Sequence, residues 1–383
     1  MKKNASKRPK LCIVSVTPLP IFFFLNDHIK ELALTNDIFV ITNASSDNYI
    51  NLEGLPITLI SINISRKINP LNDLGVLMIL MTIFLKERFD LVWGVGPKAG
   101  FLSMIASKAT MVKKRLFVFQ GEVWASKTGL FRRLLKFCDS LTAKMATNLL
   151  AVSNAEVSFL IREGVIRDDQ IQVIGYGSIT GVNIPKPIAN YQLLRKKLGI
   201  PYDAIVILYI GRIHLDKGIL DLGEAFKKLK LNHPKLHLLV VGPDEGALDR
   251  LKVLLKGFDN FLHLYGFSSD VKIFYKAADI FCLPSYREGF PISLLEASSF
   301  QLPIVVSNIY GNKDAVIEKV TGLFFQVTSV EDLVFKLEKL LLSKKMRKTL
   351  GNNGLNRVKK YFDRNTIVSA YVKFINDLLI EKV

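Results

Sequence analysis

Short apolar runs alternate with helix-patterned segments along the whole chain. In the first half these runs are LCIVSV, IFVIT, ITLISI, LVWGVG, LFVFQG and LLAVS. In the second half they are AIVILYIGR, LHLLVVG, FLHLYG, IFCLPS, PIVVS and GLFFQ. Runs of this kind are typical of parallel strands buried on both faces. Helical periodicity is clearest over residues 220–233 and 330–351. Strand and helix alternate twice over, which predicts an α/β chain with two doubly wound, Rossmann-like domains.

Two prolines mark the boundary between the predicted domains. Pro185 and Pro187 lie in the segment NIPKPIANYQ, between the last strand run of the first half and the first run of the second. We therefore expect one domain over residues 1–184 and another over 185–363, followed by a helix over 364–383 that can return to the first domain. A chain of 383 residues is long enough for two buried cores.

The apolar segments are too short or too interrupted to span a membrane. A basic tail, MKKNASKRPK, precedes a run that Pro18 and Pro20 interrupt. No small-residue cleavage site follows, so we expect a buried strand near residues 11–16 and not a secretory leader. The other long run, Leu74–Leu85, has 12 residues, whereas a bilayer needs about 20. This run predicts a buried or interfacial helix.

Composition adds a strong positive charge that is not spread evenly. The formal net charge is +18, and residues 108–144 hold nine Lys or Arg against two acids. Within this segment, TGLFRRLLKFCDSLTAKMA repeats leucine and phenylalanine near helical spacing beside basic residues. A basic amphipathic helix can lie on an anionic membrane, bind nucleic acid or form an ordinary solvated face. No aromatic–basic motif or helix-turn-helix pattern accompanies the charge, so we expect no nucleic-acid partner.

The sequence has no pattern typical of a metal, disulfide or dinucleotide site. Cys12, Cys138 and Cys282 lie far apart and form no Cys/His cluster, so we expect no metal site and a reducing compartment. The segment LVWGVGPKAGF holds a Gly-x-Gly-x-x-Ala pattern close to a dinucleotide fingerprint, but a proline interrupts its turn. We therefore expect no cofactor.

Two cations follow a predicted strand in the segment LYIGRIHLDKGILDL. The strand ends at Gly211, which lets the backbone turn, and Arg212 and Lys217 come next, before a helix. In open α/β sheets, ligands bind beyond the carboxyl ends of the strands. Two cations beside a helix N-terminus can bind a diphosphate. A surface loop with ordinary basic residues is the alternative.

Two acids eight positions apart frame the segment EGFPISLLE. Glu288 lies in a loop that follows a predicted strand. A helix is expected next, because Pro291 is suited to a first helical turn, and Glu296 lies about a turn and a half into this helix. The N–H groups at this helix start can hold a phosphate or a sugar hydroxyl. They belong to Gly289, Phe290 and Ile292. The two acids can be the carboxylate pair of a hydrolase, solvated charges or hydroxyl-binding groups.

The order and spacing of these two loops resemble a known family. GRIHLDKG followed by EGFPISLLE, with its E-x7-E pattern, is similar to the retaining glycosyltransferases of family 4, which have the GT-B fold. In the first half, ISRKINPLNDL, GPKAG and IGYGSITGVNI are similar to the bacterial branch that builds capsule and O-antigen repeat units. The resemblance covers nearly the whole chain and implies two Rossmann-like domains that face a central cleft.

The resemblance implies a nucleotide-sugar donor site in the second domain. Arg212 and Lys217 would bind the diphosphate. Glu296 would bind the ribose hydroxyls, and Glu288 would contact the donor sugar. The implied donor-binding set is Gly211, Arg212, Lys217, Glu288, Gly289, Phe290, Pro291, Ile292 and Glu296. The segment GNKDAV matches the family's next loop, with Lys313 and Asp314 where Arg and Glu are more usual.

The first domain departs from the family pattern at one position. FVFQGEVW places Gln120 where the family usually carries a histidine near the donor sugar. Glutamine can position a hydroxyl but carries no titrating proton. The catalytic set that the resemblance implies is Glu288, Arg212, Lys217 and Gln120. For an acceptor phosphate Lys98 is a candidate and Arg66 a second one, and a solvated lysine at a helix start is the alternative for Lys98.

These motifs lead to one main hypothesis and two alternatives. The main hypothesis is a peripheral enzyme on the cytoplasmic, inner face of the cell membrane. It would transfer a sugar with retention from a UDP-sugar, or less expectedly a GDP-sugar, to a lipid-linked saccharide of the undecaprenyl-diphosphate type. The first alternative is a nucleotide-sugar epimerase or hydrolase of the same fold. The second is a non-catalytic, glycosyltransferase-like partner subunit.

Overall fold

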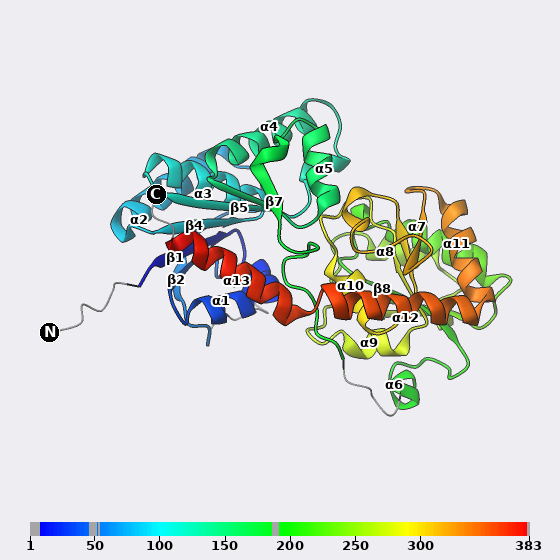
Figure 1. Cartoon of the computed structure of the whole chain (residues 1–383). Helices are drawn as coiled ribbons and strands as arrows, with labels where there is room; N and C mark the ends of the chain where they lie inside the picture. Colours follow the sequence, from blue (N-terminus) through cyan, green and yellow to red (C-terminus); the bar gives the residue numbers. More distant parts are fainter. Residues whose placement is uncertain (1–7, 46–51, 53, 186–190, 381–383) are drawn as a thin grey trace. The chain divides into compact units, whose positions relative to one another are not determined.

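The computed structural model describes residues 8–45, 52, 54–185 and 191–380, and its chain divides into two compact units (Figure 1). Unit 1 comprises residues 1–180 together with 365–383, and unit 2 comprises residues 181–364. Each unit is built on one parallel sheet. Most of the basic N-terminal tail and part of the proline-containing segment, residues 186–190, lie outside the described residues.

Unit 1 is built on a seven-stranded sheet in the order β3-β2-β1-β4-β5-β6-β7. Its strands are β1 (Lys10–Ser15), β2 (Asp37–Thr42), β3 (Thr58–Ser61), β4 (Leu91–Val95), β5 (Lys114–Phe119), β6 (Asn148–Ala151) and β7 (Ile171–Val173). The central strand β1 pairs in parallel with β2 and β4, so that Leu11 lies between Ile38 and Leu91. Leu11 and Ile13 are fully buried, as expected for a strand covered on both faces.

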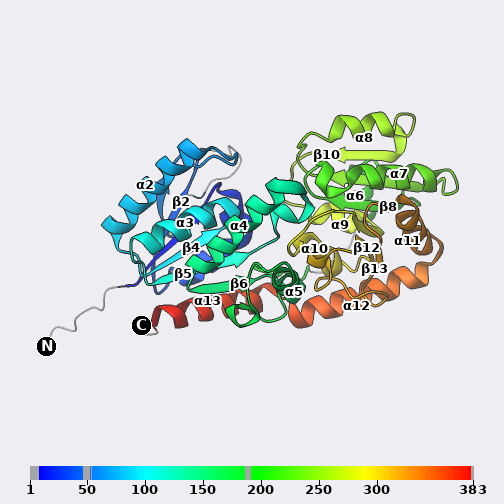
Figure 2. The same cartoon turned by 90° about the horizontal axis from the view of Figure 1, so that it is seen from above.

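Helices cover both faces of this sheet (Figures 1 and 2). One face carries α2 (Pro70–Glu87), α3 (Pro97–Ala109) and α4 (Gly129–Met145), with α3 packed between the other two. The opposite face carries α1 (Asn26–Leu32), which follows a π-helix over Ile21–Leu25, and α13 (Arg364–Ile380). Helix α5 (Asn154–Arg162) connects β6 to β7, and short 3-10 turns lie at Val123–Ser126 (η2) and Asp168–Gln170.

The last helix completes the core of unit 1. Ile367, Tyr371 and Ile375 of α13 are buried. The Tyr371 ring packs edge-on against His28 of α1, with ring centroids 5.5 Å apart. Residues from the end of the chain therefore bury the same face of the sheet as residues near its beginning.

Unit 2 has a six-stranded parallel sheet in the order β10-β9-β8-β11-β12-β13. Its strands are β8 (Ile205–Ile210), β9 (Leu236–Val241), β10 (Leu262–Tyr265), β11 (Ile280–Leu283), β12 (Ile304–Ser307) and β13 (Gly322–Phe325). Chain order reverses between β8 and β11, so the loops after these two strands lie at the switch point of the sheet. These two loops are the ones that carry the candidate chemistry.

Helices also cover both faces of the sheet of unit 2 (Figures 1 and 2). One face carries α7 (Ile219–Lys230), α8 (Leu248–Leu254) and α11 (Val330–Leu342). The other carries α6 (Tyr191–Lys197), α9 (Lys272–Ala277), α10 (Ile292–Ser299) and α12 (Lys344–Tyr361). Short 3-10 turns lie at Leu215–Lys217, Asp259–Phe261 and Tyr310–Asn312.

The predicted α/β class with two doubly wound sheets is confirmed, and all twelve predicted apolar runs are strands. The prediction lacked β7, because its three residues IQV include a polar glutamine and form no apolar run. The prediction of one helical stretch over 330–351 is wrong. Ser343 ends α11, and its side chain begins α12 by accepting a hydrogen bond of 3.1 Å from the Met346 N–H.

The two ends of unit 2 are hydrogen-bonded to each other. The Val182 N–H donates to the Phe362 carbonyl at 2.9 Å, and the Arg364 N–H donates to the Val182 carbonyl at 3.1 Å. Gly181 has a φ of +61°, and a Cβ on it would lie 2.7 Å from the Phe362 carbonyl oxygen. Only glycine fits there without a shift of the backbone.

Candidate functional site

The loop after β8 places Arg212 beside two acids of unit 2. Its guanidinium forms an ion pair with Glu245, in the loop after β9, and lies 3.6 Å from an Asp216 carboxylate oxygen. The Tyr209 hydroxyl donates to the Arg212 carbonyl at 2.7 Å and fixes the backbone of the turn. A Cβ on Gly211 would lie 2.9 Å from that hydroxyl. Arg212 is thus held at the end of β8, in the position predicted from the sequence.

Lys217 and Glu288, which the sequence separates by 71 positions, form an ion pair in unit 2. The Lys217 Nζ lies 2.7 Å from the Glu288 Oε1, and the two side chains are only 12% and 14% exposed. The turn that brings them together needs Gly218, whose φ is +65° and whose Cβ would lie 2.1 Å from the Pro284 carbonyl oxygen. The structure therefore joins the predicted diphosphate loop to the predicted sugar loop.

Helix α10 begins at Ile292, four positions after Glu288, and its N-cap residue makes no side-chain hydrogen bond. Pro291 is its N-cap residue, with extended backbone, one position ahead of the predicted first turn. Among the described residues, the N–H groups of Gly289 and Phe290 have no hydrogen-bond acceptor. The backbone of Gly311 packs closely against this loop, since a Cβ at Gly311 would lie 2.1 Å from the Glu288 carbonyl oxygen. Uncapped N–H groups at a helix start favour an anionic ligand.

Glu296 lies on α10, and among the described residues its carboxylate has one hydrogen-bond partner, Tyr275 of α9. The Tyr275 hydroxyl donates to Glu296 Oε2 at 2.8 Å. The Tyr275 ring stacks on Phe300 with centroids 5.3 Å apart, so the hydroxyl is held in place. Burial raises the pKa of the Glu296 carboxyl, while the Tyr275 hydrogen bond acts in the opposite direction. A carboxylate with one donor keeps the capacity to accept hydrogen bonds from two vicinal hydroxyls.

The sequence prediction missed several charged neighbours of these residues. Asp216 accepts from His214 at 2.5 Å and lies 3.5 Å from the Arg287 guanidinium. Burial raises the pKa of the Asp216 carboxyl. The His214 hydrogen bond and the charges of Lys217 and Arg212 lower it by more, so the net shift of this pKa is downward. Asp216 of DKG and Arg287 of YREG are visible in the two motifs, but their spacing in the sequence does not predict that they form an ion pair.

In unit 1, Gln120 follows β5 directly, at the predicted strand end. Its side-chain NH₂ is buried and has no hydrogen-bond partner within the described part of the chain. It borders a small cavity of about 20 Å³, which Glu122 and Asp139 also line. A cavity of this size holds about one water. The role of Gln120 as a contact to a sugar stays a prediction.

The two cations of unit 1 that were predicted to bind the acceptor substrate, Lys98 and Arg66, both contact other residues of unit 1. Lys98 lies at the start of α3 and forms an ion pair of 2.6 Å with Asp73 of α2. Its Nζ also donates to the Lys67 carbonyl at 2.6 Å. The Arg66 guanidinium donates to the Thr17 hydroxyl at 3.4 Å. The ion pair with Asp73 compensates for a cation at a helix N-terminus, which is otherwise unfavourable. Acceptor binding by Lys98 and Arg66 stays a prediction.

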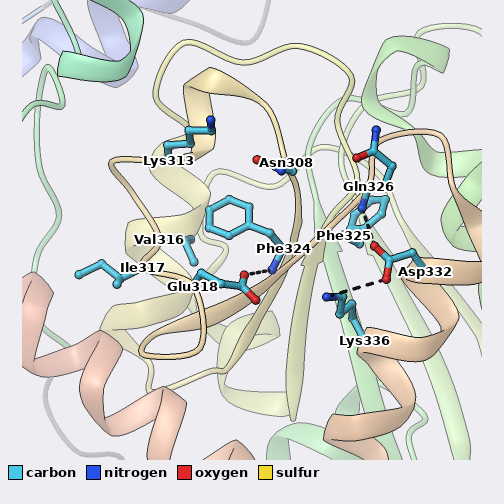
Figure 3. A pocket seen from close by; sticks show the side chains of 10 residues that line it. All are labelled: Asn308, Lys313, Val316, Ile317, Glu318, Phe324, Phe325, Gln326, Asp332 and Lys336. Atoms are coloured by element: carbon cyan, nitrogen blue, oxygen red, sulfur yellow. Dashed lines mark hydrogen bonds and ion pairs between the residues drawn. The ribbon is translucent and has the colours of Figure 1, made fainter. Parts of the chain in front are cut away.

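A pocket of about 570 Å³ opens beside β12 and β13 of unit 2 (Figure 3). Within it, Glu318 accepts the Phe324 N–H at 2.6 Å, and Asp332 lies 3.8 Å from the Lys336 ammonium. Lys313 of the predicted phosphate loop lies at its rim. Among the described residues that line it, none belongs to the nine-residue donor set. The pocket is therefore distinct from the cluster around the Lys217 ion pair.

Apolar side chains on α4 point into solvent. Leu130, Leu134 and Phe137 are 81%, 54% and 63% exposed and recur at helical spacing. On the same face of the sheet, α2 exposes further apolar side chains, which are Leu71, Leu74, Met78, Ile79 and Leu85. The helix over Leu74–Leu85 was predicted to be buried or interfacial. It is half-exposed, and the buried residues of α2 are Val76, Leu80 and Phe84. Within the described residues no helix is both long and apolar enough to cross a membrane.

Comparison with known proteins matches each half of the chain to a glycosyltransferase domain. A model described as "Glycosyl transferase 4-like domain" matches residues 33–177, and one described as "Glycosyl transferases group 1" matches residues 190–357. The capsular polysaccharide biosynthesis glycosyltransferase CapM of Staphylococcus aureus is 29% identical over 323 residues, which cover 84% of this chain and 85% of CapM.

Two further comparisons cover almost the whole chain. The N,N'-diacetylbacillosaminyl-diphospho-undecaprenol alpha-1,3-N-acetylgalactosaminyltransferase of Campylobacter jejuni is 29% identical over 378 residues, or 95% of this chain and 97% of that protein. The structure of Anabaena Alr3699/HepE in complex with UDP-glucose superposes with a TM-score of 0.79 at 19% identity, covering 96% of this chain and 99% of HepE. The chain is thus a glycosyltransferase with the GT-B fold, and it belongs to the family 4 enzymes that join a 4-like domain to a group 1 domain.

Proposed function

We propose that this glycosyltransferase moves a sugar, with retention, from a UDP-sugar to a lipid-linked saccharide of the undecaprenyl-diphosphate type in surface polysaccharide synthesis. The names of the relatives support this proposal, because one acts in capsule synthesis and another on a diphospho-undecaprenol sugar. A complex of a structural neighbour with UDP-glucose supports UDP as the nucleotide. The observation in this chain that carries the proposal is the Lys217–Glu288 ion pair at the start of the uncapped helix α10.

In the proposed reaction, the bond between the anomeric carbon and the donor phosphate breaks, and a bond to the acceptor oxygen forms on the same face. The acceptor proton passes to the departing diphosphate. Arg212 and Lys217 neutralise that diphosphate, and the N–H groups of Gly289, Phe290 and Ile292 add hydrogen bonds. Charge stabilisation at a leaving group is worth most where the donors are fixed before the reaction, as they are in this loop.

The donor has to compete for cations that are already paired. Lys217 is held by Glu288 at 2.7 Å, and Arg212 is held by Glu245. We assign Glu288 two successive roles. In the absence of donor it is the counter-ion of Lys217. When the donor binds and its phosphate pairs with Lys217, Glu288 contacts the donor sugar. Glu296, oriented by Tyr275, is assigned to the ribose hydroxyls. Gly211 and Pro291 shape the two loops.

We further propose that unit 1 lies on the inner face of the cell membrane through α4 and α2. The exposed apolar stripe of α4 is flanked by the exposed cations Lys127, Arg133 and Lys144. By contrast, Arg132 and Lys136 form ion pairs with Glu163, with nitrogen–oxygen distances of 2.8 and 3.0 Å. An apolar stripe with basic edges matches an anionic bilayer surface. A lipid-linked acceptor would then be met in the membrane where it resides.

A thermal-shift panel of nucleotides and nucleotide sugars tests the donor proposal. At a concentration 100 times its Kd, a ligand that binds only the folded state stabilises it by about 2.7 kcal/mol. We expect UDP and one UDP-sugar to raise the melting temperature, and the variant Glu296→Ala to lose this response. A chain that responds to no nucleotide sugar would overturn the proposal.

Vesicle co-sedimentation tests the membrane proposal. We expect binding to vesicles rich in phosphatidylglycerol and not to phosphatidylcholine vesicles at physiological salt. The double variant Leu134→Glu/Phe137→Glu should abolish binding without loss of stability, because both side chains are exposed. Leu342→Glu on α11, where the side chain is 75% exposed in unit 2, is the control for an added acid on an exposed apolar position. Equal binding by both variants contradicts the assignment of α4.

A further inference from the structure

The pocket beside β12 and β13 is a second place in unit 2 with the size and position of a ligand site (Figure 3). Its volume of about 570 Å³ falls within the range of small-molecule sites, about 300–1,000 Å³. Asn308 directly follows β12, and Gln326 directly follows β13, so the pocket opens at the carboxyl ends of two parallel strands. Ligands of α/β sheets bind at this edge.

Two side-chain amides lie next to each other at the strand ends. The register pairs Ser307 with Phe325, which makes Asn308 and Gln326 neighbours on adjacent strands. The Asn308 N–H donates to the Phe325 carbonyl at 2.9 Å, so the backbone of this strand end is held. Both amide side chains are exposed, and within the described residues neither has a hydrogen-bond partner. Each amide can therefore donate to a ligand and accept from it.

Two acids of the pocket are held in place by the backbone of β13. Glu318 Oε2 accepts the Phe324 N–H at 2.6 Å, and Asp332 Oδ2 accepts the Gln326 N–H at 2.7 Å. The other oxygen of Asp332 lies 3.8 Å from the Lys336 ammonium, beyond hydrogen-bond distance. Each carboxylate thus keeps the capacity to accept a hydroxyl. Because β13 is an edge strand and these two N–H groups are capped, the ligand is not an added strand of another protein.

Phe324 adds an aromatic ring to the same pocket (Figure 3). Successive side chains of a strand point to opposite faces of the sheet. Phe325 is accordingly 1% exposed, whereas Phe324 is only half-buried. In Figure 3 its ring is seen between Lys313 and Glu318. An aromatic ring can pack against the C–H groups of a sugar, while the amides and carboxylates beside it bond to the hydroxyls.

The charges that line the pocket balance. Two cations, Lys313 and Lys336, are matched by two acids, Glu318 and Asp332. A phosphate or another ion therefore meets no excess of opposite charge. A neutral ligand that carries many hydroxyls can use donors and acceptors alike. The lining thus favours a neutral saccharide over a nucleotide.

We propose that this pocket is a second saccharide site, which binds a neutral di- or trisaccharide apart from the nucleotide-sugar donor. Asn308 and Gln326 hydrogen-bond to its hydroxyls, and Phe324 packs against the C–H face of one ring. Glu318 and Asp332 accept hydrogen bonds from further hydroxyls. The source of the saccharide is either a free glycan or the sugar part of a lipid-linked acceptor. This inference goes beyond the proposed function and does not need the donor assignment.

Saturation-transfer difference NMR on the full chain tests for binding without any activity. The probes are maltotriose, cellotriose and N,N′-diacetylchitobiose. We expect at least one of them to bind with a Kd of about 1 mM. The double variant Asn308→Ala/Gln326→Ala should weaken this binding about tenfold, because two hydrogen-bonding side chains are lost. Asn232→Ala, at an exposed position between α7 and β9, is the matched control for loss of a surface amide from unit 2.

Two results of this measurement would overturn the proposal. One is that none of the three saccharides gives a signal with wild type. The other is that the double variant binds as wild type does. Both substituted side chains are exposed, so the fold should be kept, and the melting temperature of the double variant checks this. Phe324→Leu, which keeps an apolar side chain, should weaken binding as well if the aromatic ring contacts the sugar.

Competition with UDP separates the pocket from the donor site. UDP in excess should leave the saccharide signal unchanged, and the variant Glu296→Ala should keep that signal. Displacement of the saccharide by UDP contradicts the proposal, because the two ligands would then share one site. If the chain binds a saccharide but no nucleotide, the proposed function fails and the saccharide site stands.

Kinetics with the lipid-linked acceptor distinguish the two sources of the saccharide. If the pocket binds the sugar part of the acceptor, Asn308→Ala/Gln326→Ala should raise the KM for the acceptor about tenfold. Its kcat and its KM for the donor should stay at the wild-type values. If the pocket binds a free glycan, the KM for the acceptor should not change, and the loss should be confined to the NMR signal of the free saccharide.

Discussion

Removing Lys217 tests the donor site most directly, because the change leaves a carboxylate without its partner. In wild type the Lys217 ammonium lies 2.7 Å from Glu288, and both side chains are largely buried. Two unit charges about 4 Å apart interact by about 4 kcal/mol at an effective dielectric constant of 20. The variant Lys217→Ala loses this attraction for the departing diphosphate and exposes the donor to the charge of Glu288. We expect a loss of about 3–4 kcal/mol in transition-state stabilisation, or 10²–10³-fold in kcat/KM.

The assay is the initial rate of nucleotide release with the donor that the thermal-shift panel identifies and a lipid-linked acceptor. The double variant Lys217→Ala/Glu288→Gln should recover part of the lost donor affinity, because the uncompensated charge is gone. A coupling energy of about 1–3 kcal/mol is typical of two residues in contact. Lys228→Ala is the matched control, since its ion pair with Glu331 is 50% and 77% exposed and such pairs contribute about 0–1 kcal/mol.

A value of kcat/KM for Lys217→Ala within threefold of wild type would refute the reasoning. Additive effects in the double variant would contradict the coupling of the two side chains in the donor site. The melting temperature of each variant, measured without donor, shows whether the loss comes from folding.

Three further predictions follow from contacts within unit 2. Tyr275→Phe removes the one donor that the described residues supply to the Glu296 carboxylate and should weaken UDP binding by about 0.5–1.5 kcal/mol in calorimetry, without change in the chemistry. Gly218→Ala should lower stability by at least about 2 kcal/mol in urea unfolding, because its Cβ would lie 2.1 Å from a carbonyl oxygen at a positive φ. Burial lowers the pKa of His237 from its usual 6.5 to about 4, so the folded state keeps it neutral while the unfolded state takes up a proton. Stability is therefore complete above pH 6.5 and should fall by about 1–2 kcal/mol by pH 5, a loss that His237→Leu should lack.

Most strands were predictable from the sequence, because a strand buried on both faces leaves an uninterrupted apolar run. β7 was not, since an edge strand of three residues can contain Gln172 without cost. The division between α11 and α12 was also missed. The sequence around Ser343 keeps its helical periodicity, and only the cap geometry at that residue shows that one helix ends and another begins.

The positions of the candidate donor residues were predictable, but their partners were not. Loop order after β8 and β11 placed Arg212 and Glu288 at the switch point of the sheet. The partners of Arg212 and Glu296, namely Glu245 and Tyr275, lie 33 and 21 positions away and belong to no motif. Such pairs depend on how two loops fold against each other.

The hydrogen-bonded ends of unit 2 make it an insertion within unit 1 and set an order for folding. Residues 181–364 form a continuous segment whose two ends meet at Val182 and Phe362, so this segment can fold as soon as it has left the ribosome. Unit 1 must wait for α13, which supplies Tyr371 to its core and follows the whole of unit 2 in the chain. A deletion that removes α13 should therefore expose the core of the half of the protein that is made first, while the later half keeps its fold.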